Sequence, residues 1–287
     1  MMIGKIKQFN FKSLLILNTF ALIVTSYFFK NFICLGVYTL FFFISLFTTK
    51  NGLKTIKKLN LLQNIRTEGP SNHFKKSNTP TMGGIFMIIP FLIFLLIITI
   101  NLGSLKLLLL LFTIFGFFFT GFLDDYLSIK NRKNTGLKSK EKFILQSIIS
   151  IIFIFIAYEN DLINPLIKIS ESWEIDTSIF IFPISFLVLV GISNSVNLTD
   201  GLDGLAAGCS GIVFYGLGTE ILMKEQKELF VFSLLCYSMS GICLGFLKYN
   251  NYPAKIFMGD TGSLSIGAIL GSIALLTNSI FTLSIFS

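Results

Sequence analysis

Five aspartates are the residues of this 287-residue chain whose type and spacing point most directly to chemistry. Asp124 and Asp125 stand side by side at the end of a long apolar run. Asp200 and Asp203 share a short loop, and Asp260 closely precedes another apolar run. Carboxylates at the edge of hydrocarbon are costly to keep there, which makes them functional candidates. Two adjacent carboxylates also repel each other, which favours a bound cation or a proton on one of them. The alternative is a plain membrane-edge cap.

Basic and small residues accompany the aspartates in an earlier polar stretch. Lys75 and Lys76 follow His73, and they could meet an anionic substrate or lipid head groups, or belong to a merely solvated loop. Gly83 and Gly84 stand at the start of an apolar run, where they would let the backbone approach a ligand closely.

The stretch 194–204 and Phe257 complete the candidate set. The stretch carries two Asn, two Asp and two Gly without a basic residue, and if it is helical, Asp200 and Asp203 share one face. A plain turn would explain its glycines but not both carboxylates. Phe257 could stack on a base or a sugar, although packing is the commoner role of a phenylalanine.

Membrane-spanning helices are the elements that must position these residues. Hydrophobic residues make up 53% of the chain and charged residues 13%, against about 25% charged residues in soluble domains. With a mean hydropathy of +0.77, this composition excludes a water-soluble globule, a disordered chain and a nucleic-acid-binding protein. Because a bilayer core needs about 20 apolar residues per helix, the sequence predicts spans at 14–29, 32–49, 85–102, 105–122, 143–158, 179–193, 204–222, 229–247 and 263–284. We therefore expect an all-α polytopic integral membrane protein of about nine helices, with residues 1–287 forming one domain.

The basic residues indicate which loops face the cytoplasm. Nine spans would place five segments on one side of the membrane: 1–13, 50–84, 123–142, 194–203 and 248–262. These segments carry 18 of the 23 Lys and Arg, so the positive-inside rule makes this side cytoplasmic. All five aspartates lie on it. Oxygen donors without thiols, in a chain whose single His excludes a multi-His metal site, suit Mg²⁺, which usually works with substrate phosphates. The residues alone therefore predict phosphoryl transfer onto or from a lipid.

Four motifs together resemble a known family. They are TPTMGG at 79–84, GFLDDY at 121–126, NSVNLTDGLDGLAAG at 194–208 and FMGDTGS at 257–263. With EGPSNHFKK at 68–76, they are similar to the phospho-N-acetylmuramoyl-pentapeptide-transferase family of the polyprenyl-phosphate N-acetylhexosamine-1-phosphate transferase superfamily. TPTMGG and NLTDGLDG favour this branch over the bacterial GlcNAc-1-phosphate branch.

The resemblance implies a Mg²⁺-dependent transferase of the bacterial inner membrane that serves peptidoglycan synthesis. Such an enzyme moves phospho-MurNAc-pentapeptide from UDP-MurNAc-pentapeptide to undecaprenyl phosphate at the cytoplasmic face, and it releases UMP and forms lipid I. Membrane lipids are further partners, nucleic acid is not one, and a homodimer is left open.

Matching positions carry the family's roles onto this chain. Asp124, Asp125 and Asp260 would be catalytic, and the metal ligands would be Asp260, Asp125 and Asn197. The substrate-binding residues would be Lys76, Thr81, Asn197, Asp200, Asp203 and Phe257.

Two departures from the family pattern leave other interpretations open. The family usually has a Lys four positions after the first aspartate of the pair, where this chain has Ser128, so Lys130 or Lys133 would have to compensate. The family also continues into a His-rich loop and further helices, whereas this chain ends at Ser287, as a truncated product or a reduced homologue would. The alternatives are a transferase for another UDP-hexosamine, and a catalytically impaired homologue that acts as a scaffold or binds nucleotide.

Overall fold

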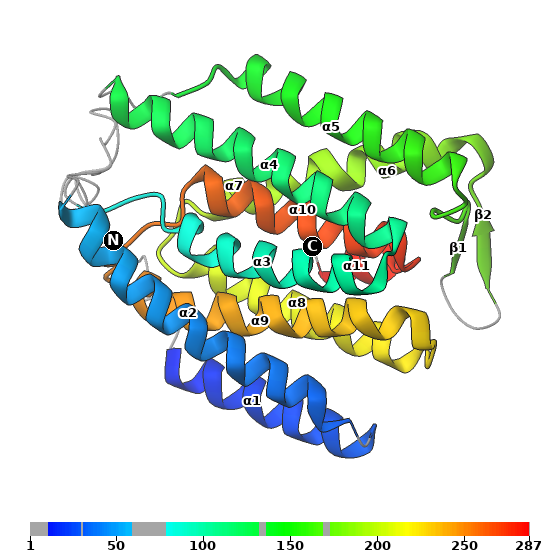
Figure 1. Ribbon diagram of the computed structural model, residues 1–287, viewed down its shortest axis with the longest axis horizontal. Helices are drawn as coiled ribbons and strands as arrows, with labels where there is room; N and C mark the ends of the chain where they lie inside the picture. The colour runs from blue at the N-terminus through cyan, green and yellow to red at the C-terminus, as the bar shows by residue number, and fades with distance from the viewer. Residues whose placement is uncertain (1–10, 30, 59–78, 132–135, 169–172, 287) are drawn as a thin grey trace, which may run out of the picture.

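Helices form nearly all of the part of the chain that the computed structural model describes, residues 11–29, 31–58, 79–131, 136–168 and 173–286 (Figure 1). The main helices are α1 (Phe11–Phe28), α2 (Phe32–Lys58), α3 (Gly84–Leu102), α4 (Leu105–Lys130), α5 (Ser139–Glu159), α6 (Ile181–Phe186), α7 (Ile192–Thr199), α8 (Leu205–Met223), α9 (Phe230–Asn250), α10 (Asp260–Leu276) and α11 (Ile280–Phe286). Short 3-10 turns η2 (Ser178–Phe180) and η4 (Lys227–Leu229) precede α6 and α9, and a π-helical turn, η3 (Leu187–Gly191), joins α6 to α7. The prediction of an all-α fold is confirmed.

A small hairpin forms the one sheet among the described residues. Strands β1 (Leu166–Lys168) and β2 (Glu174–Asp176) pair antiparallel, with Leu166 opposite Asp176. The hairpin projects from one end of the bundle (Figure 1).

Eight helical segments in the described part of the chain are long and apolar enough to cross a membrane. They are α1, α2, α3, α4, α5, the continuous run Ser178–Thr199, α8 and the run Lys227–Asn250. Their outward faces carry large apolar side chains such as Phe43, Phe47 and Phe155, each more than 60% exposed. Such faces suit hydrocarbon and not water, which confirms a polytopic membrane protein.

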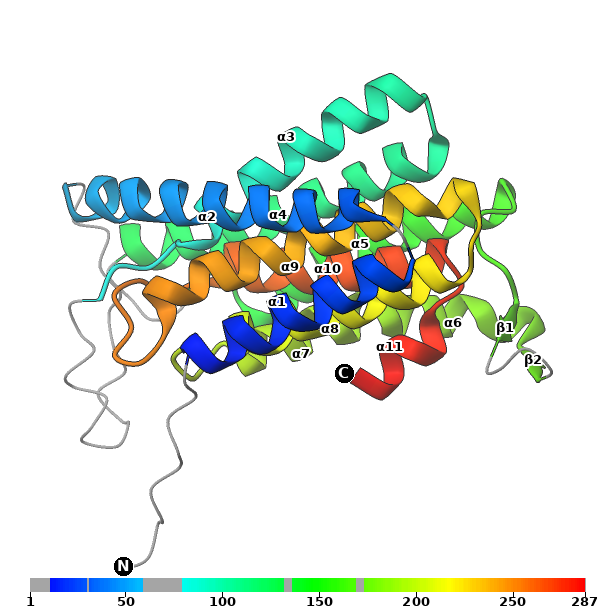
Figure 2. The same ribbon diagram turned by 90° about the horizontal axis from the view of Figure 1, so that it is seen from below.

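Helix α10 lies in the middle of the bundle, among α3, α4, α7 and α8 (Figures 1 and 2). Every residue of α10 from Thr261 to Leu276 is buried. Small residues allow this close packing: a Cβ on Gly262 would meet Gly84 of α3, and one on Gly267 would overlap Ser193 of α7. Helix α10 has 17 residues. Its complete burial from Thr261 onward shows that it forms the centre of the bundle.

The predicted ninth span, 263–284, is wrong as a continuous helix. Helix α10 ends at Leu276, Asn278 adopts a left-handed backbone conformation (φ 54°), and α11 begins at Ile280. The ammonium of Lys224 on α8 donates to the carbonyl oxygens of Thr277 (2.8 Å) and Asn278 (3.1 Å). These contacts satisfy helix-end carbonyls that would otherwise be unpaired, so the break is stabilised from a neighbouring helix.

Two helices extend beyond their predicted ends, and this places the aspartate pair within a helix. The apolar pattern of α2 and α4 ends near residues 49 and 122, but the helices continue to Lys58 and Lys130. Asp124 and Asp125 therefore sit inside the last two turns of α4, and the two residues are only 9% and 8% exposed.

The ends of five helices meet at one end of the bundle, which we call the carboxylate end. It comprises the end of α4, the start of α5, the end of α7 and the starts of α3 and α10 (Figure 1). Phe257 donates its N–H to Pro80 O (2.8 Å), and Gly83 and Gly84 donate theirs to the carbonyls of Phe257 and Met258 (2.8 Å each). The loops predicted to share one side are thus held together by backbone hydrogen bonds.

Candidate functional site

Three carboxylates converge at the carboxylate end. One oxygen each from Asp124, Asp125 and Asp260 lies within 4.8 Å of the others. The first two come from α4 and the third is the first residue of α10. The sequence predicted these residues as a set, and the packing of α10 against α4 brings them together.

Asp125 caps the start of α10. Its Oδ1 accepts from the backbone N–H of Asp260 (3.1 Å), and its Oδ2 accepts from the backbone N–H (2.9 Å) and the hydroxyl (2.5 Å) of Thr261. A carboxylate at a helix N-terminus satisfies unpaired N–H groups and is favoured by the helix dipole. Gly259 must be a glycine here, because its φ is 76° and a Cβ would lie 2.5 Å from Asp125 Oδ2.

Lys142, in the first turn of α5, stands between two of the carboxylates. Its Nζ lies 2.7 Å from Asp260 Oδ2 and 3.3 Å from Asp124 Oδ1. Asp124 Oδ1 also accepts from the backbone N–H of Leu137 at 2.9 Å. One ammonium thus offsets the repulsion between the buried Asp124 and the half-buried Asp260, which is stronger where part of the solvent is excluded.

Asn197 holds the other oxygen of Asp260. Its Nδ2 donates to Asp260 Oδ1 (2.8 Å) and to Ser263 Oγ (2.9 Å), which links the end of α7 to the start of α10. Asp260 therefore has Lys142 on one oxygen and Asn197 on the other.

Asp200 and Asp203 do not share a helical face, because α7 ends at Thr199 and a turn follows. Burial raises the pKa of Asp200 well above its ordinary value, and the charges of Asp260 and Asp125 raise it further. Asp203 Oδ2 accepts from the backbone N–H of Ala254 (3.1 Å) and so ties this turn to the loop before α10.

The predicted substrate-binding residues Thr81 and Phe257 lie on two adjoining segments. Thr81 is buried, and Phe257 is half-buried next to Gly83. The close approach expected of the glycine pair is made to protein and not to a ligand, because Gly83 and Gly84 face Phe257 and Gly262. The predicted Lys76, with Lys75 and His73, falls outside the described residues.

Sequence reasoning missed Lys142 as a site residue. Lys130, which was expected to replace the missing family lysine, lies instead over the ring of Tyr126 (6.0 Å to the centroid), and Lys133 falls outside the described residues. The available signal was a lysine that directly precedes an apolar span, in the same loop region as the aspartate pair.

Asn250, at the end of α9, was missed as well. It is buried, accepts from the backbone N–H of Gly204 (3.1 Å) and donates to Ile256 O (3.0 Å). It therefore joins the loops that carry Asp203 and Asp260. A lone Asn at a helix end carries no sequence signal for such a role.

The residues present fit a hard divalent cation. The cluster offers carboxylate and amide oxygens without a thiol, which is the donor chemistry that Mg²⁺ and Mn²⁺ prefer. Lys142 already occupies a cationic position between Asp124 and Asp260, so the cluster is arranged for positive charge. Asp125 keeps one acceptor site on Oδ1, which accepts a single hydrogen bond, whereas Oδ2 accepts two.

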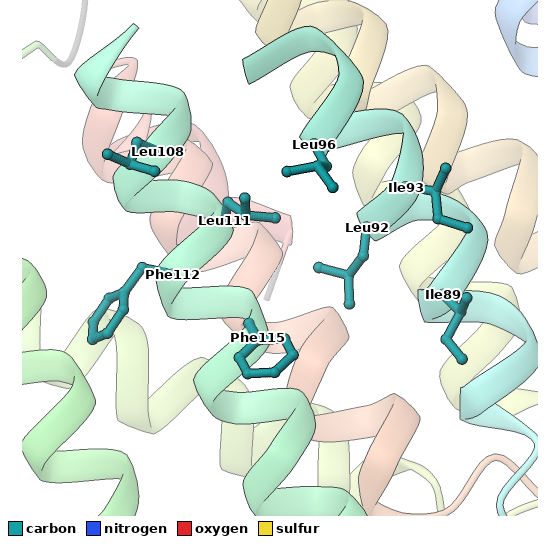
Figure 3. A pocket seen from close by; sticks show the side chains of 8 residues that line it. All are labelled: Ile89, Leu92, Ile93, Leu96, Leu108, Leu111, Phe112 and Phe115. Atoms are coloured by element: carbon teal, nitrogen blue, oxygen red, sulfur yellow. The ribbon is translucent and has the colours of Figure 1, made fainter. Parts of the chain in front are cut away.

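An open apolar groove of about 440 Å³ lies between α3 and α4, in the half of α4 away from the aspartates (Figure 3). It is lined by Ile89, Leu92, Ile93, Leu96, Leu108, Leu111, Phe112 and Phe115. Its walls suit hydrocarbon chains and carry no group that could react.

The fold and the site define a multi-pass membrane protein with a carboxylate–lysine cluster, and comparison with known proteins places it among the transferases. The family model described as glycosyl transferase family 4 matches residues 107–278, which include α4 and α10. A model described as phospho-N-acetylmuramoyl-pentapeptide-transferase signature 1 matches residues 76–88.

Curated relatives define the family more narrowly. The chain is 85% identical to a phospho-N-acetylmuramoyl-pentapeptide-transferase of Prochlorococcus marinus (strain MIT 9312), over 100% of this chain and 80% of the relative. It is 62% identical, over the same shares, to one from Prochlorococcus marinus subsp. pastoris (strain CCMP1986 / NIES-2087 / MED4). It is 39% identical to one of Thermodesulfovibrio yellowstonii, over 85% of this chain and 71% of the relative. The chain belongs to the phospho-N-acetylmuramoyl-pentapeptide-transferase family.

Proposed function

We propose that this chain transfers phospho-MurNAc-pentapeptide from UDP-MurNAc-pentapeptide to undecaprenyl phosphate and releases UMP. The observation that carries the proposal is the cluster of Asp124, Asp125, Asp260 and Lys142 at the carboxylate end of a membrane bundle. Phosphoryl transfer between two phosphates requires charge neutralisation and positioning more than covalent chemistry, and these residues can provide both.

Each residue of the cluster has a proposed part in the transfer. Asp125, Asp260 and Asn197 would hold Mg²⁺, which when bound would supply the positive charge that neutralises the diphosphate and the UMP leaving group. Lys142 binds phosphate oxygens, since its three donors face the cluster. Asp124 orients or deprotonates the lipid phosphate, whose oxygen attacks the sugar-linked phosphorus in line as the bond to UMP breaks.

The uridine diphosphate is proposed to lie among Lys76, Thr81, Asn197, Asp200, Asp203 and Phe257. Phe257 and Thr81 adjoin the cluster through the hydrogen bonds of Pro80 and Gly83, which supports their part in this pocket. The excess of basic residues on these loops supports a cytoplasmic-facing site in the bacterial inner membrane. Residues 1–287 are proposed to act as one domain.

Release of UMP from UDP-MurNAc-pentapeptide, measured with undecaprenyl phosphate and Mg²⁺ in detergent, tests the proposal. We expect turnover that falls by about 10²–10³-fold in Asp260→Asn, because removing a preorganised charge from a reacting centre costs that much. Asp161→Asn is the matched control: this exposed aspartate lies beyond the far end of α5, and Asn tolerates its φ of 53°.

Other outcomes would support the alternatives. Release of UMP from UDP-GlcNAc alone would indicate a different UDP-hexosamine. Binding of UDP-MurNAc-pentapeptide by folded protein without release of UMP would indicate an impaired homologue, and turnover that Asp260→Asn leaves intact would contradict the proposed site.

A further inference from the structure

A second polar contact lies inside the bundle, about one helical turn further from the carboxylate end than Lys142 and Asn197. Asn194 Nδ2 on α7 donates to Gln146 Oε1 on α5 at 2.7 Å. Gln146 is fully buried, and both residues belong to apolar segments long enough to cross a membrane. Burying an amide group at this depth costs free energy unless the group is hydrogen-bonded. The pair is therefore a candidate for a specific structural or functional role.

The pair joins the two helices that hold Asp260. Gln146 is four residues after Lys142 on α5, and Asn194 is three residues before Asn197 on α7, so each pair of neighbours shares a helix face. Lys142 contacts one oxygen of Asp260 and Asn197 contacts the other. The distance between α5 and α7 at this level therefore decides whether both contacts form.

The π-helical turn η3 directly precedes this part of α7. Asn194 Nδ2 also donates to the carbonyl oxygen of Val190, within η3, at 2.7 Å. A π-turn adds one residue to the helix and so rotates everything after it, and such turns occur frequently at functional sites. The same amide of Asn194 therefore contacts both the π-turn of its own helix and Gln146 of α5.

An unpaired donor separates this contact from ordinary packing. Gln146 Nε2 has no hydrogen-bond partner among the described residues, and neither has Ser150 Oγ one turn further along α5. A buried donor without a partner lowers stability, which offsets part of what the hydrogen bond to Asn194 contributes to folding. The role that we assign to Gln146 is to fix the position of Asn194 through its side-chain oxygen.

We propose that Gln146 is a positioning residue, which through Asn194 sets the spacing of α5 and α7 so that Lys142 and Asn197 meet opposite oxygens of Asp260. Changing the length of either amide alone would alter the spacing of α5 and α7, displace Lys142 or Asn197 from Asp260 and weaken cation binding at the cluster. The effect on turnover rests on the proposed function, whereas the effect on cation binding does not.

A length swap between the two amides tests the proposal with full-length protein. Gln146→Asn shortens one side chain by a methylene group, and combining it with Asn194→Gln restores the total length. We expect Gln146→Asn alone to raise the apparent Kd for Mg²⁺, measured from the Mg²⁺-induced rise in Tm, by about tenfold, which corresponds to about 1.4 kcal/mol. The swapped pair should recover at least half of the logarithmic loss. Ser150→Ala, on the same buried face, should leave the Kd within twofold of wild type.

Turnover separates this proposal from the proposed function. UMP release should follow the same order: lowered in Gln146→Asn, recovered in the swapped pair and unchanged in Ser150→Ala, with KM for the UDP substrate within twofold throughout. A Mg²⁺ Kd that Gln146→Asn leaves unchanged, or a swapped pair no better than the single variant, would overturn the positioning role. If the Mg²⁺ Kd values of the variants follow the expected order but the wild-type protein releases no UMP, only the proposed function is contradicted. If Gln146→Asn fails to fold, the Mg²⁺ Kd and the UMP release of Asn194→Gln are compared with those of the swapped pair. The swapped pair should again bind Mg²⁺ more tightly and release more UMP than the single variant.

Discussion

Lys142 is the side chain on which the charge balance of the cluster depends. Its ammonium lies within 3.3 Å of Asp124 and 2.7 Å of Asp260, while Asp125 is satisfied by the start of α10. Partial burial of all these groups makes each charge expensive without its partner. The lysine therefore serves the folded state and, under the proposed function, the phosphate groups of the substrate.

Lys142→Met should abolish most turnover. The variant leaves Asp124 and Asp260 without their shared cation and removes the proposed phosphate contact, so UMP release should fall by about 10²–10³-fold. Lys140→Met is the matched control, since Lys140 is exposed in the same helical turn. Equal activity of the two variants would show that Lys142 has no part in the reaction.

Asp200→Asn should stabilise the metal-free protein at alkaline pH. Burial raises the pKa of Asp200, so ionising this group opposes folding. That cost is absent below the ordinary pKa of an aspartate and grows as the pH rises through it towards the folded-state value. In EDTA, the variant should gain about 2–4 °C in Tm at pH 8 and gain nothing near pH 4. A gain that is the same at both pH values would contradict an electrostatic origin.

At the scale of elements, the contact between α4 and α10 builds the site. Asp125 of α4 caps α10, and Gly121, one turn earlier on α4, lies against the backbone of Asp260. A Cβ on Gly121 would overlap the carbonyl oxygen of Asp260 and lie 2.7 Å from the nitrogen of Thr261. The close approach of α4 and α10 is thus possible only because Gly121 has no side chain.

Gly121→Ala should therefore displace the start of α10. We expect a loss of stability of about 1–3 kcal/mol from overpacking, together with a loss of UMP release, because Asp260 moves with its backbone. Gly36→Ala on α2 is the control, since a Cβ there meets nothing within 4 Å. Thermal unfolding and turnover measure both effects, and a Gly121→Ala enzyme as active and stable as Gly36→Ala would refute the close contact.

At the scale of the whole molecule, the two ends of the membrane bundle differ in the residues that they carry. The aspartates gather at the carboxylate end, whereas the opposite end carries the β1–β2 hairpin and the Lys224 contacts that end α10 (Figure 1). Asn131 and Asn160 are the C-terminal cap residues of α4 and α5 and mark the two ends. The positive-inside rule predicts that the Asn131 end faces the cytoplasm.

Single cysteines at these two caps test that orientation. In a Cys209→Ser background, which removes the one exposed native thiol, a membrane-impermeant maleimide should label Asn160→Cys in intact spheroplasts. It should label Asn131→Cys only in inside-out vesicles. The reverse pattern would place the aspartates outside the cytoplasm, where a nucleotide-linked substrate is not supplied.

Much of this protein was predictable from the sequence, because its determinants are local. Runs of apolar residues long enough to cross a bilayer predict the helices wherever they occur, and the excess of lysine predicts that four distant loops share one side. Asp124, Asp125 and Asp260 stand out because charged groups at a membrane edge are rare. The observed end of α4 differs from the predicted one because hydropathy marks the edge of hydrocarbon, whereas the helix continues into polar residues to Lys130.

Only the tertiary structure decided which groups meet. Lys142, Gln146 and Asn194 look unremarkable in the sequence, yet they contact Asp260 or each other across 48 to 118 residues. The break after α10 likewise depends on Lys224, 53 residues earlier. Hydropathy and motif spacing are properties of neighbouring residues in the chain. Side-chain hydrogen bonds, in contrast, depend on the rotation and spacing of packed helices. Small residues such as Gly121 and Gly262 set that rotation and spacing only once α10 lies inside the bundle.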